Sequence, residues 1–294
     1  MTGLIAATHS PFHDDTSINL DVVETQASHL VTNKVQAAFI CGTTGESHSL
    51  TTEERLQFAV RWAEVTHNSG LDVIVHVGEN CLENSRTLAA HAEQHGAKAI
   101  AMLAPSYFKP GNVSTLVDCC KLVASAAPDT PFYFYDIPSM TNVSLSMVEF
   151  LRQAADAIPT LAGLKFTNPD LIVFQKCLSE FGDRFDILWG VDEMLLPALA
   201  CGATGAVGST YNFAASIYLK LMEAYAQGDF ETARKYQIQS IRLVDILVKR
   251  GYMASAKALM KRQGVNVGPP RLPNARLSAT SQNELLEELQ TAGF

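Results

Sequence analysis

Short apolar segments rich in β-branched residues recur along the chain and alternate with stretches of helical periodicity. Several of these segments are apolar at nearly every position, which is typical of strands that are covered on both faces. We predict eight strands, at residues 4–8, 37–41, 72–77, 99–105, 131–136, 161–167, 185–190 and 203–209. Strands that alternate with helices form parallel sheets, and eight of them predict closure into a (β/α)8 barrel.

Helix signals occur between the strands and continue after the eighth. Thr51 and Glu54 form a capping-box pattern, which predicts a helix that begins near Thr51. Asp229 is placed to cap a second helix whose apolar residues recur three apart. A barrel of this kind uses about 250 residues. We therefore expect a barrel over residues 1–212 and a helical extension over residues 213–294 that packs on it as one structural unit.

Composition and charge narrow the functional classes. The formal charge of −8, from 22 basic and 30 acidic residues, gives no broad positive field for nucleic acid or anionic lipid. No stretch reaches the roughly 18 apolar residues of a membrane span, and the first residues lack a secretory pattern. We expect a soluble, cytoplasmic protein. The six cysteines include no CxxC pair, so we interpret them as reduced and structural.

Chemistry in (β/α)8 barrels lies at the carboxyl ends of the strands, and the sixth predicted strand carries a lysine there. Side chains alternate along a strand, so Lys165 shares a face with Gly163 and Thr167. The opposite face is apolar and suits packing under helices; it consists of Ala162, Leu164 and Phe166. This parity directs Lys165 into the barrel, where desolvation favours a neutral amine able to attack a carbonyl. The alternative is a lysine that extends its ammonium to water.

The second strand is followed by Gly42-Thr43-Thr44-Gly45. The glycines allow a tight turn, and the threonine hydroxyls lie beside exposed backbone N–H groups. Such a turn can bind a small carboxylate without a formal positive charge. An ordinary connection between strand and helix fits the same residues equally well.

Three further strand ends carry polar groups. The fifth strand places Tyr133 and Tyr135 on one face, with Tyr135 at the mouth, where a phenol can transfer a proton or simply pack. The seventh strand ends at Gly190 and leads into Asp192 and Glu193, two acids that suit a polyol or the start of a helix. The eighth is rich in glycine, a feature of phosphate sites in barrels.

A metal site is not indicated. His76 and Glu79 lie near the third strand, but no His-x-His pair or second carboxylate stands at ligand spacing. We interpret His76 as a core histidine.

Taken in order, the strand-end motifs carry a resemblance. They are Gly42-Thr43-Thr44-Gly45-Glu46, Tyr135-Asp136-Ile137-Pro138, Gly163-Leu164-Lys165, Gly190-Val191-Asp192-Glu193 and Gly208-Ser209-Thr210-Tyr211-Asn212. This set resembles the N-acetylneuraminate lyase and dihydrodipicolinate synthase superfamily over nearly the whole chain. Within the superfamily it looks most like the lyases, and residues 203–212 and 268–273 are especially similar to the animal-type enzymes.

The resemblance implies a reversible aldolase that splits N-acetylneuraminate into pyruvate and N-acetylmannosamine. It implies no metal or organic cofactor, because the substrate forms an imine on Lys165. Thr43 and Thr44 would hold the pyruvyl carboxylate and Tyr135 would transfer a proton. The sugar portion would contact Thr167, Gly190, Asp192, Glu193 and Ser209. The superfamily typically forms tetramers, so a homotetramer is expected.

Two positions bear on alternatives. Tyr107, after the fourth strand, is expected near the catalytic tyrosine, and residues 139–141 lack the arginine that dihydrodipicolinate synthases carry for their second substrate. That absence counts against a synthase-like condensation. An aldolase or dehydratase for another 2-keto-3-deoxy sugar acid would keep Lys165 and Tyr135. A barrel that binds a sugar acid without catalysis is the non-enzymatic alternative, disfavoured because burying Lys165 without use is costly.

Overall fold

The computed structural model describes residues 1–294 and contains eight parallel strands that close into one barrel in sequence order. The strands are β1 (Gly3–Ala7), β2 (Ala37–Ile40), β3 (Asp72–His76), β4 (Ala99–Leu103), β5 (Phe132–Asp136), β6 (Leu161–Phe166), β7 (Asp186–Trp189) and β8 (Gly205–Gly208). Closure occurs where β1 pairs with β8. The predicted barrel is confirmed, and each predicted strand overlaps an observed one.

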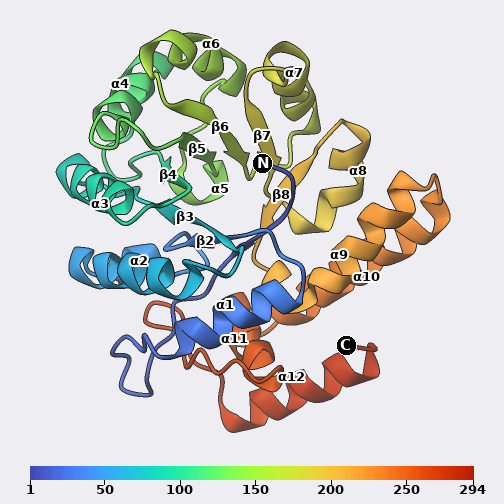
Figure 1. Cartoon of the computed structure of the whole chain (residues 1–294). Coiled ribbons are helices and arrows are strands. Elements are labelled where there is room, and N and C mark those ends of the chain that lie inside the picture. Colours follow the sequence, from blue (N-terminus) through green and yellow to red (C-terminus); the bar gives the residue numbers. More distant parts are fainter.

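Helices surround the barrel and extend beyond it (Figure 1). Those up to the eighth strand are α1 (Val22–Thr32), α2 (Thr52–Thr66), α3 (Leu82–Gln94), α4 (Val113–Ala124), α5 (Pro138–Thr141), α6 (Met147–Ala157), α7 (Leu171–Phe181) and α8 (Leu195–Ala200). They are followed by α9 (Tyr211–Ala226), α10 (Phe230–Val248), α11 (Tyr252–Arg262) and α12 (Ala279–Thr291). Two short 3-10 helices, η1 (Ser47–Ser49) and η2 (Asp192–Met194), follow β2 and β7.

The predicted helix starts are confirmed at two positions. Thr51 Oγ1 accepts a hydrogen bond from the Glu54 amide at 3.2 Å, and Glu54 Oε2 accepts one from the Thr51 amide at 2.9 Å. Asp229 accepts from the amide of Thr232 at 3.0 Å and so caps α10. Caps of this type stabilise a helix by about 1 kcal/mol, because they satisfy backbone donors that would otherwise lack partners.

The apolar residues form two clusters, as strand alternation requires. The larger cluster lies between the strands and the helices and includes Leu164 and Phe166. The smaller one fills the barrel interior and includes Phe39 and Tyr135. Ala162 corrects the predicted parity, since it packs on the interior cluster and not beside Leu164 and Phe166. The pairing of β5 with β6 shifts register at this point, which places one extra residue in β6 and resets the alternation.

The helices after β8 lie along one side of the barrel (Figure 1). Helix α9 packs against β1 and α10, next to the point where the barrel closes. The predicted boundary between residues 212 and 213 falls inside α9, so that division of the chain stays a prediction. None of the helices combines the length and the apolar character needed to cross a bilayer.

Candidate active site

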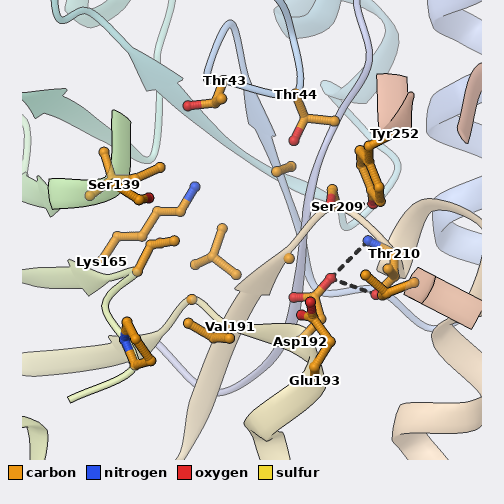
Figure 2. Close-up of a pocket in the computed structure, with 18 of the residues that line it drawn as sticks. Thr43, Thr44, Ser139, Lys165, Val191, Asp192, Glu193, Ser209, Thr210 and Tyr252 are labelled. Atoms are coloured by element: carbon orange, nitrogen blue, oxygen red, sulfur yellow. Dashed lines mark hydrogen bonds between the residues drawn. The ribbon is translucent and has the colours of Figure 1, made fainter. Parts of the chain in front are cut away.

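A cavity of about 430 Å³ opens at the carboxyl ends of the strands. Nine of the ten residues that the sequence singles out line it: Thr43, Thr44, Tyr135, Lys165, Thr167, Gly190, Asp192, Glu193 and Ser209. They come from strands or turns around most of the barrel. Figure 2 shows the Lys165 amine pointing into the space between them, with Thr43 and Thr44 on one side and Asp192 and Glu193 on another.

Lys165 lies inside the barrel with only 4% of its surface exposed. Its Nζ lies 3.8 Å from the centre of the Tyr135 ring and 4.0 Å from that of Phe39. Burial lowers the pKa of Lys165 to about 7, although the negative charge of Asp192 opposes the shift. Near neutral pH a substantial fraction of this side chain is therefore an uncharged amine, the form that attacks a carbonyl carbon.

The threonine turn connects β2 to η1. The Glu46 amide donates to Thr43 O at 3.0 Å and the Ser47 amide donates to Gly42 O at 3.2 Å, which closes the turn on itself. Thr43 Oγ1 lies 3.3 Å from the hydroxyl of Tyr135. The turn thus presents a hydroxyl that is already hydrogen-bonded to the neighbouring phenol.

Tyr135 and Tyr133 both face the barrel interior, as predicted, but at different depths. Tyr135 lines the cavity, whereas the Tyr133 hydroxyl donates to Asp186 Oδ2 at 2.6 Å and does not line it. Burial raises the pKa of Tyr135 to about 12, against the effect of its hydrogen bond with Thr43. Tyr135 is consequently a neutral phenol at physiological pH and exchanges protons through hydrogen bonds.

Asp192 is buried, and its carboxylate accepts two hydrogen bonds from Thr210, the second residue after β8. Its Oδ2 accepts from Thr210 Oγ1 at 2.6 Å and from the Thr210 amide at 3.0 Å (Figure 2). Burial raises the pKa of Asp192 to about 6, although these bonds lower it. A β-carbon at Gly208 would stand 1.9 Å from Asp192 Oδ1, so only glycine fits there. Because Asp192 follows β7 and Thr210 follows β8, these bonds tie the two strand ends together at the cavity wall.

Glu193 and Gly190 complete this side of the cavity. Glu193 is half-buried and lines the cavity next to Asp192. A β-carbon at Gly190 would lie 2.0 Å from Thr167 Oγ1, so glycine lets β7 approach that hydroxyl. Thr167 Oγ1 is buried, and its contact with the Tyr135 hydroxyl helps to lower the pKa of that phenol.

Tyr252 is a cavity residue that the sequence did not reveal. It begins α11, and its hydroxyl lies 2.5 Å from Ser209 Oγ. Val244, Val248 and Met253 add apolar surface from α10 and α11. No motif marks these helical positions, because their place in the cavity depends on how the C-terminal helices pack. Thr210 stood inside a recognised motif, yet only the structure shows that it holds Asp192.

Tyr107 lies outside the cavity. It is 78% exposed, its ring packs edge-on against Phe108, and its amide donates to Asn80 Oδ1 at 2.9 Å. Within one chain Tyr107 is therefore exposed and contributes nothing to the cavity lining, and its expected place near Tyr135 stays a prediction.

His76 is fully buried and packs near Phe39 and Tyr135, which confirms it as a core histidine. Its Nδ1 donates to Cys41 O at 2.9 Å. The structure contains no group of three or more histidine, cysteine, aspartate or glutamate side chains arranged to hold a metal ion. All six cysteines are free thiols.

Comparisons with known proteins agree on the family. The model of the dihydrodipicolinate synthetase family matches residues 1–292. The N-acetylneuraminate lyase of Mus musculus is 42% identical over 277 residues, which cover 93% of this chain and 87% of that protein. The structure of Proteus mirabilis N-acetylneuraminate lyase superposes with a TM-score of 0.96 at 41% identity and covers 100% of this chain and 99% of that chain.

A dihydrodipicolinate synthase from Bacillus anthracis shares the fold with a TM-score of 0.92, at 25% identity, over 99% of this chain and 98% of its own. The fold alone therefore does not separate the two activities. The chain belongs to the dihydrodipicolinate synthetase family, and its sequence is nearer to these two N-acetylneuraminate lyases than to that synthase.

Proposed function

We propose that the protein reversibly splits N-acetylneuraminate into pyruvate and N-acetylmannosamine through a Schiff base on Lys165. The observation that carries the proposal is the buried Lys165 amine, whose pKa is lowered to about 7 inside a cavity lined by hydroxyls and carboxylates. The 40–42% identity to N-acetylneuraminate lyases supports the choice of substrate.

Substrate recognition divides between the two sides of the cavity. The carboxylate of the open-chain substrate binds at the hydroxyls of Thr43 and Thr44, which places the C2 carbonyl beside Lys165. The polyhydroxylated portion extends toward Asp192, Glu193 and Ser209, since carboxylates and hydroxyls accept hydrogen bonds from sugar hydroxyls. Thr167 bonds the same portion.

The chemistry begins when the neutral Lys165 amine attacks C2 and water leaves, which gives a protonated imine. The C4 hydroxyl then passes its proton through the hydrogen-bonded hydroxyls of Tyr135 and Thr43 to the carboxylate of the bound substrate, while the C3–C4 bond breaks. The bond's electron pair moves to the imine nitrogen, so N-acetylmannosamine leaves as an aldehyde and an enamine remains. Protonation at C3 and hydrolysis release pyruvate and free Lys165. The imine is the electron sink, and the reaction needs no metal or organic cofactor.

A synthase-like condensation lacks support in the cavity. Ser139 lines the wall where a second carboxylate would need a positive partner, and no arginine is among the lining residues. The acids Asp192 and Glu193 suit a polyol better than a carboxylate, because like charges repel.

We also propose that the protein forms a homotetramer in the cytoplasm. The resemblance to the superfamily supports tetramers, and Tyr107 and Phe108, exposed to 78% and 85%, offer apolar surface for contacts between copies. Light scattering of the purified protein tests the assembly, and a monodisperse monomer would contradict it.

The decisive experiment incubates the protein with N-acetylneuraminate and follows pyruvate with lactate dehydrogenase. Borohydride added during turnover should reduce the imine, and peptide mapping should find the adduct on Lys165. Lys165→Met is the control that should give neither pyruvate nor adduct. An adduct on another residue, or pyruvate release only from a different 2-keto-3-deoxy acid in a parallel panel, would overturn the assignment.

A further inference from the structure

The threonine turn is bracketed by two residues in an unusual backbone conformation. Cys41 and Glu46, at its two ends, both have φ of +54°. Residues with a β-carbon adopt this left-handed region rarely, and they stay there when surrounding contacts hold them. The shape of the turn therefore depends on what holds its ends.

The Glu46 end is held by the C-terminal part of the chain. Its carboxylate is fully buried and lies 2.7 Å from Nζ of Lys257, a buried residue of α11. The other carboxylate oxygen accepts from the Arg271 amide at 2.8 Å and from Asn274 Nδ2 at 3.3 Å. A buried carboxylate with this many partners has one position open to it.

Lys257 reaches the turn by a second route through Ser10. Its ammonium donates to Ser10 O at 2.9 Å and to Pro269 O at 3.2 Å. The Ser10 hydroxyl in turn donates to the carbonyl of Gly45 at 2.7 Å. One ammonium thus fixes both the side chain that follows the turn and, through Ser10, the last carbonyl within it.

The same helix also contacts the cavity at a second point. Tyr252, five residues before Lys257 in α11, bonds Ser209 at 2.5 Å. Figure 2 shows Tyr252 beside Ser209, on the part of the wall between Thr44 and Asp192. Helix α11 therefore touches both the carboxylate side and the sugar side from outside the barrel.

We propose that Lys257 and Glu46 form a positioning pair that holds the Thr43-Thr44 turn in the shape that binds the pyruvyl carboxylate. This inference rests on the proposed function, because it assigns the turn to a 2-oxo acid. Neither Lys257 nor Glu46 lines the cavity, so both act through Thr43 and Thr44. Loss of the pair lets the turn relax, and small misplacements of a binding group weaken recognition by large factors.

The test measures the pyruvate concentration that gives half-maximal borohydride trapping of Lys165. In the double variant Lys257→Met/Glu46→Gln, no uncompensated charge remains to unfold the protein. That concentration should rise on the order of tenfold. The KM for N-acetylmannosamine in the condensation direction should stay within about twofold, since the sugar side is untouched.

Two further variants keep the test decisive. Glu46→Asp retains both charges but shortens the side chain by one methylene, and it should raise the pyruvate concentration for half-maximal trapping a few-fold. This variant tests the inference even if the double variant does not fold. Arg250→Met removes a partly buried ion pair between the α10–α11 connection and Glu288 of α12, and should leave trapping unchanged.

Trapping at wild-type pyruvate concentrations in Glu46→Asp and in any folded double variant would overturn the inference alone. An equal rise in the requirement for both substrates would also overturn it, because it would indicate a general structural role. Wild-type protein that pyruvate does not trap would instead overturn the proposed function.

Discussion

Two lysines are buried in this protein, and their surroundings differ in kind. Lys165 and Lys257 are 4% and 2% exposed, and each ammonium lies over an aromatic ring. Lys257 also meets the carboxylate of Glu46 and two backbone carbonyls. Lys165 meets no carboxylate at ion-pair distance and no hydrogen-bond acceptor in the protein.

The comparison shows that burial alone does not decide what a lysine does. Burial lowers the pKa of both, to about 7 for Lys165 and about 8 for Lys257, where Glu46 opposes the effect. The Lys257 ammonium is compensated by its partners, so it serves as a structural tie. The Lys165 ammonium has no such partners and loses its proton near neutral pH. The neutral amine that results can act as a nucleophile, but its burial does not stabilise the fold.

The largest expected effect is the loss of catalysis when Lys165 is replaced. Lys165→Met should lower kcat for cleavage of N-acetylneuraminate by about 10⁴-fold or more, because no imine can form. Pyruvate release measured with excess protein gives the residual rate, and circular dichroism checks folding. A loss of less than about 100-fold would mean that another amine carries the reaction.

The second prediction concerns the sign of the stability change. Lys257→Met should lower the free energy of unfolding by about 3–5 kcal/mol, since it leaves Glu46 buried without its ammonium. Lys165→Met should raise it. The pKa of Lys165 is lower in the folded protein than in the unfolded chain. Its burial therefore lowers the free energy of unfolding by the full amount below pH 7, and this loss becomes smaller as the pH rises toward 10.

Urea unfolding at pH 8 measures both variants, and there the Lys165 cost is roughly 3 kcal/mol. Repeating the comparison at pH 10 should shrink the gain from Lys165→Met. Changes of the same sign in the two variants would refute the contrast between the lysines.

The third prediction uses the pH dependence of catalysis. Because protonated Lys165 cannot attack a carbonyl, kcat/KM should fall about tenfold per pH unit below pH 7. Initial rates between pH 5 and pH 9 at constant ionic strength measure this decrease, which is the acidic limb of the pH profile. A profile that stays flat down to pH 5 would mean that the free amine does not limit the rate.

The smallest expected effect separates the two acids of the cavity. The charge of Asp192 raises the pKa of Lys165, so Asp192→Asn should move the acidic limb to lower pH by less than about one unit. Glu193→Gln is the matched control, since it alters sugar binding without moving the limb. A shift to higher pH in Asp192→Asn would contradict the assigned interaction.

Sequence predicted the barrel and the place of Lys165 because both depend on local patterns. Continuous apolar runs mark strands that are covered on both faces, and parity near the carboxyl end of β6 suffices to direct Lys165 inward. Ala162 was misplaced because its orientation depends on a register shift against β5, which only the neighbouring strand determines.

The parts of the site that depend on packing between distant segments were not predictable. Through α11, Tyr252 reaches the cavity wall and Lys257 reaches Glu46 beside the threonine turn, and nothing in the helical sequence marks either residue. Tyr107 shows the converse, since this tyrosine follows a strand end but is exposed and does not line the cavity. Residue type and spacing identify groups that strands carry, whereas groups brought in by later helices need coordinates.

Helix α11 gives this barrel a practical property for directed evolution. A mutagenesis library confined to the strand ends varies Thr43, Asp192 and Ser209 but leaves the helix behind them unchanged. Helix α11 offers two further positions for selection. Tyr252 contacts Ser209 on the sugar side of the cavity, and Lys257 contacts Glu46 beside the turn that binds the carboxylate. Engineers who seek altered substrate range without loss of the Lys165 chemistry have this remote helix as a starting point.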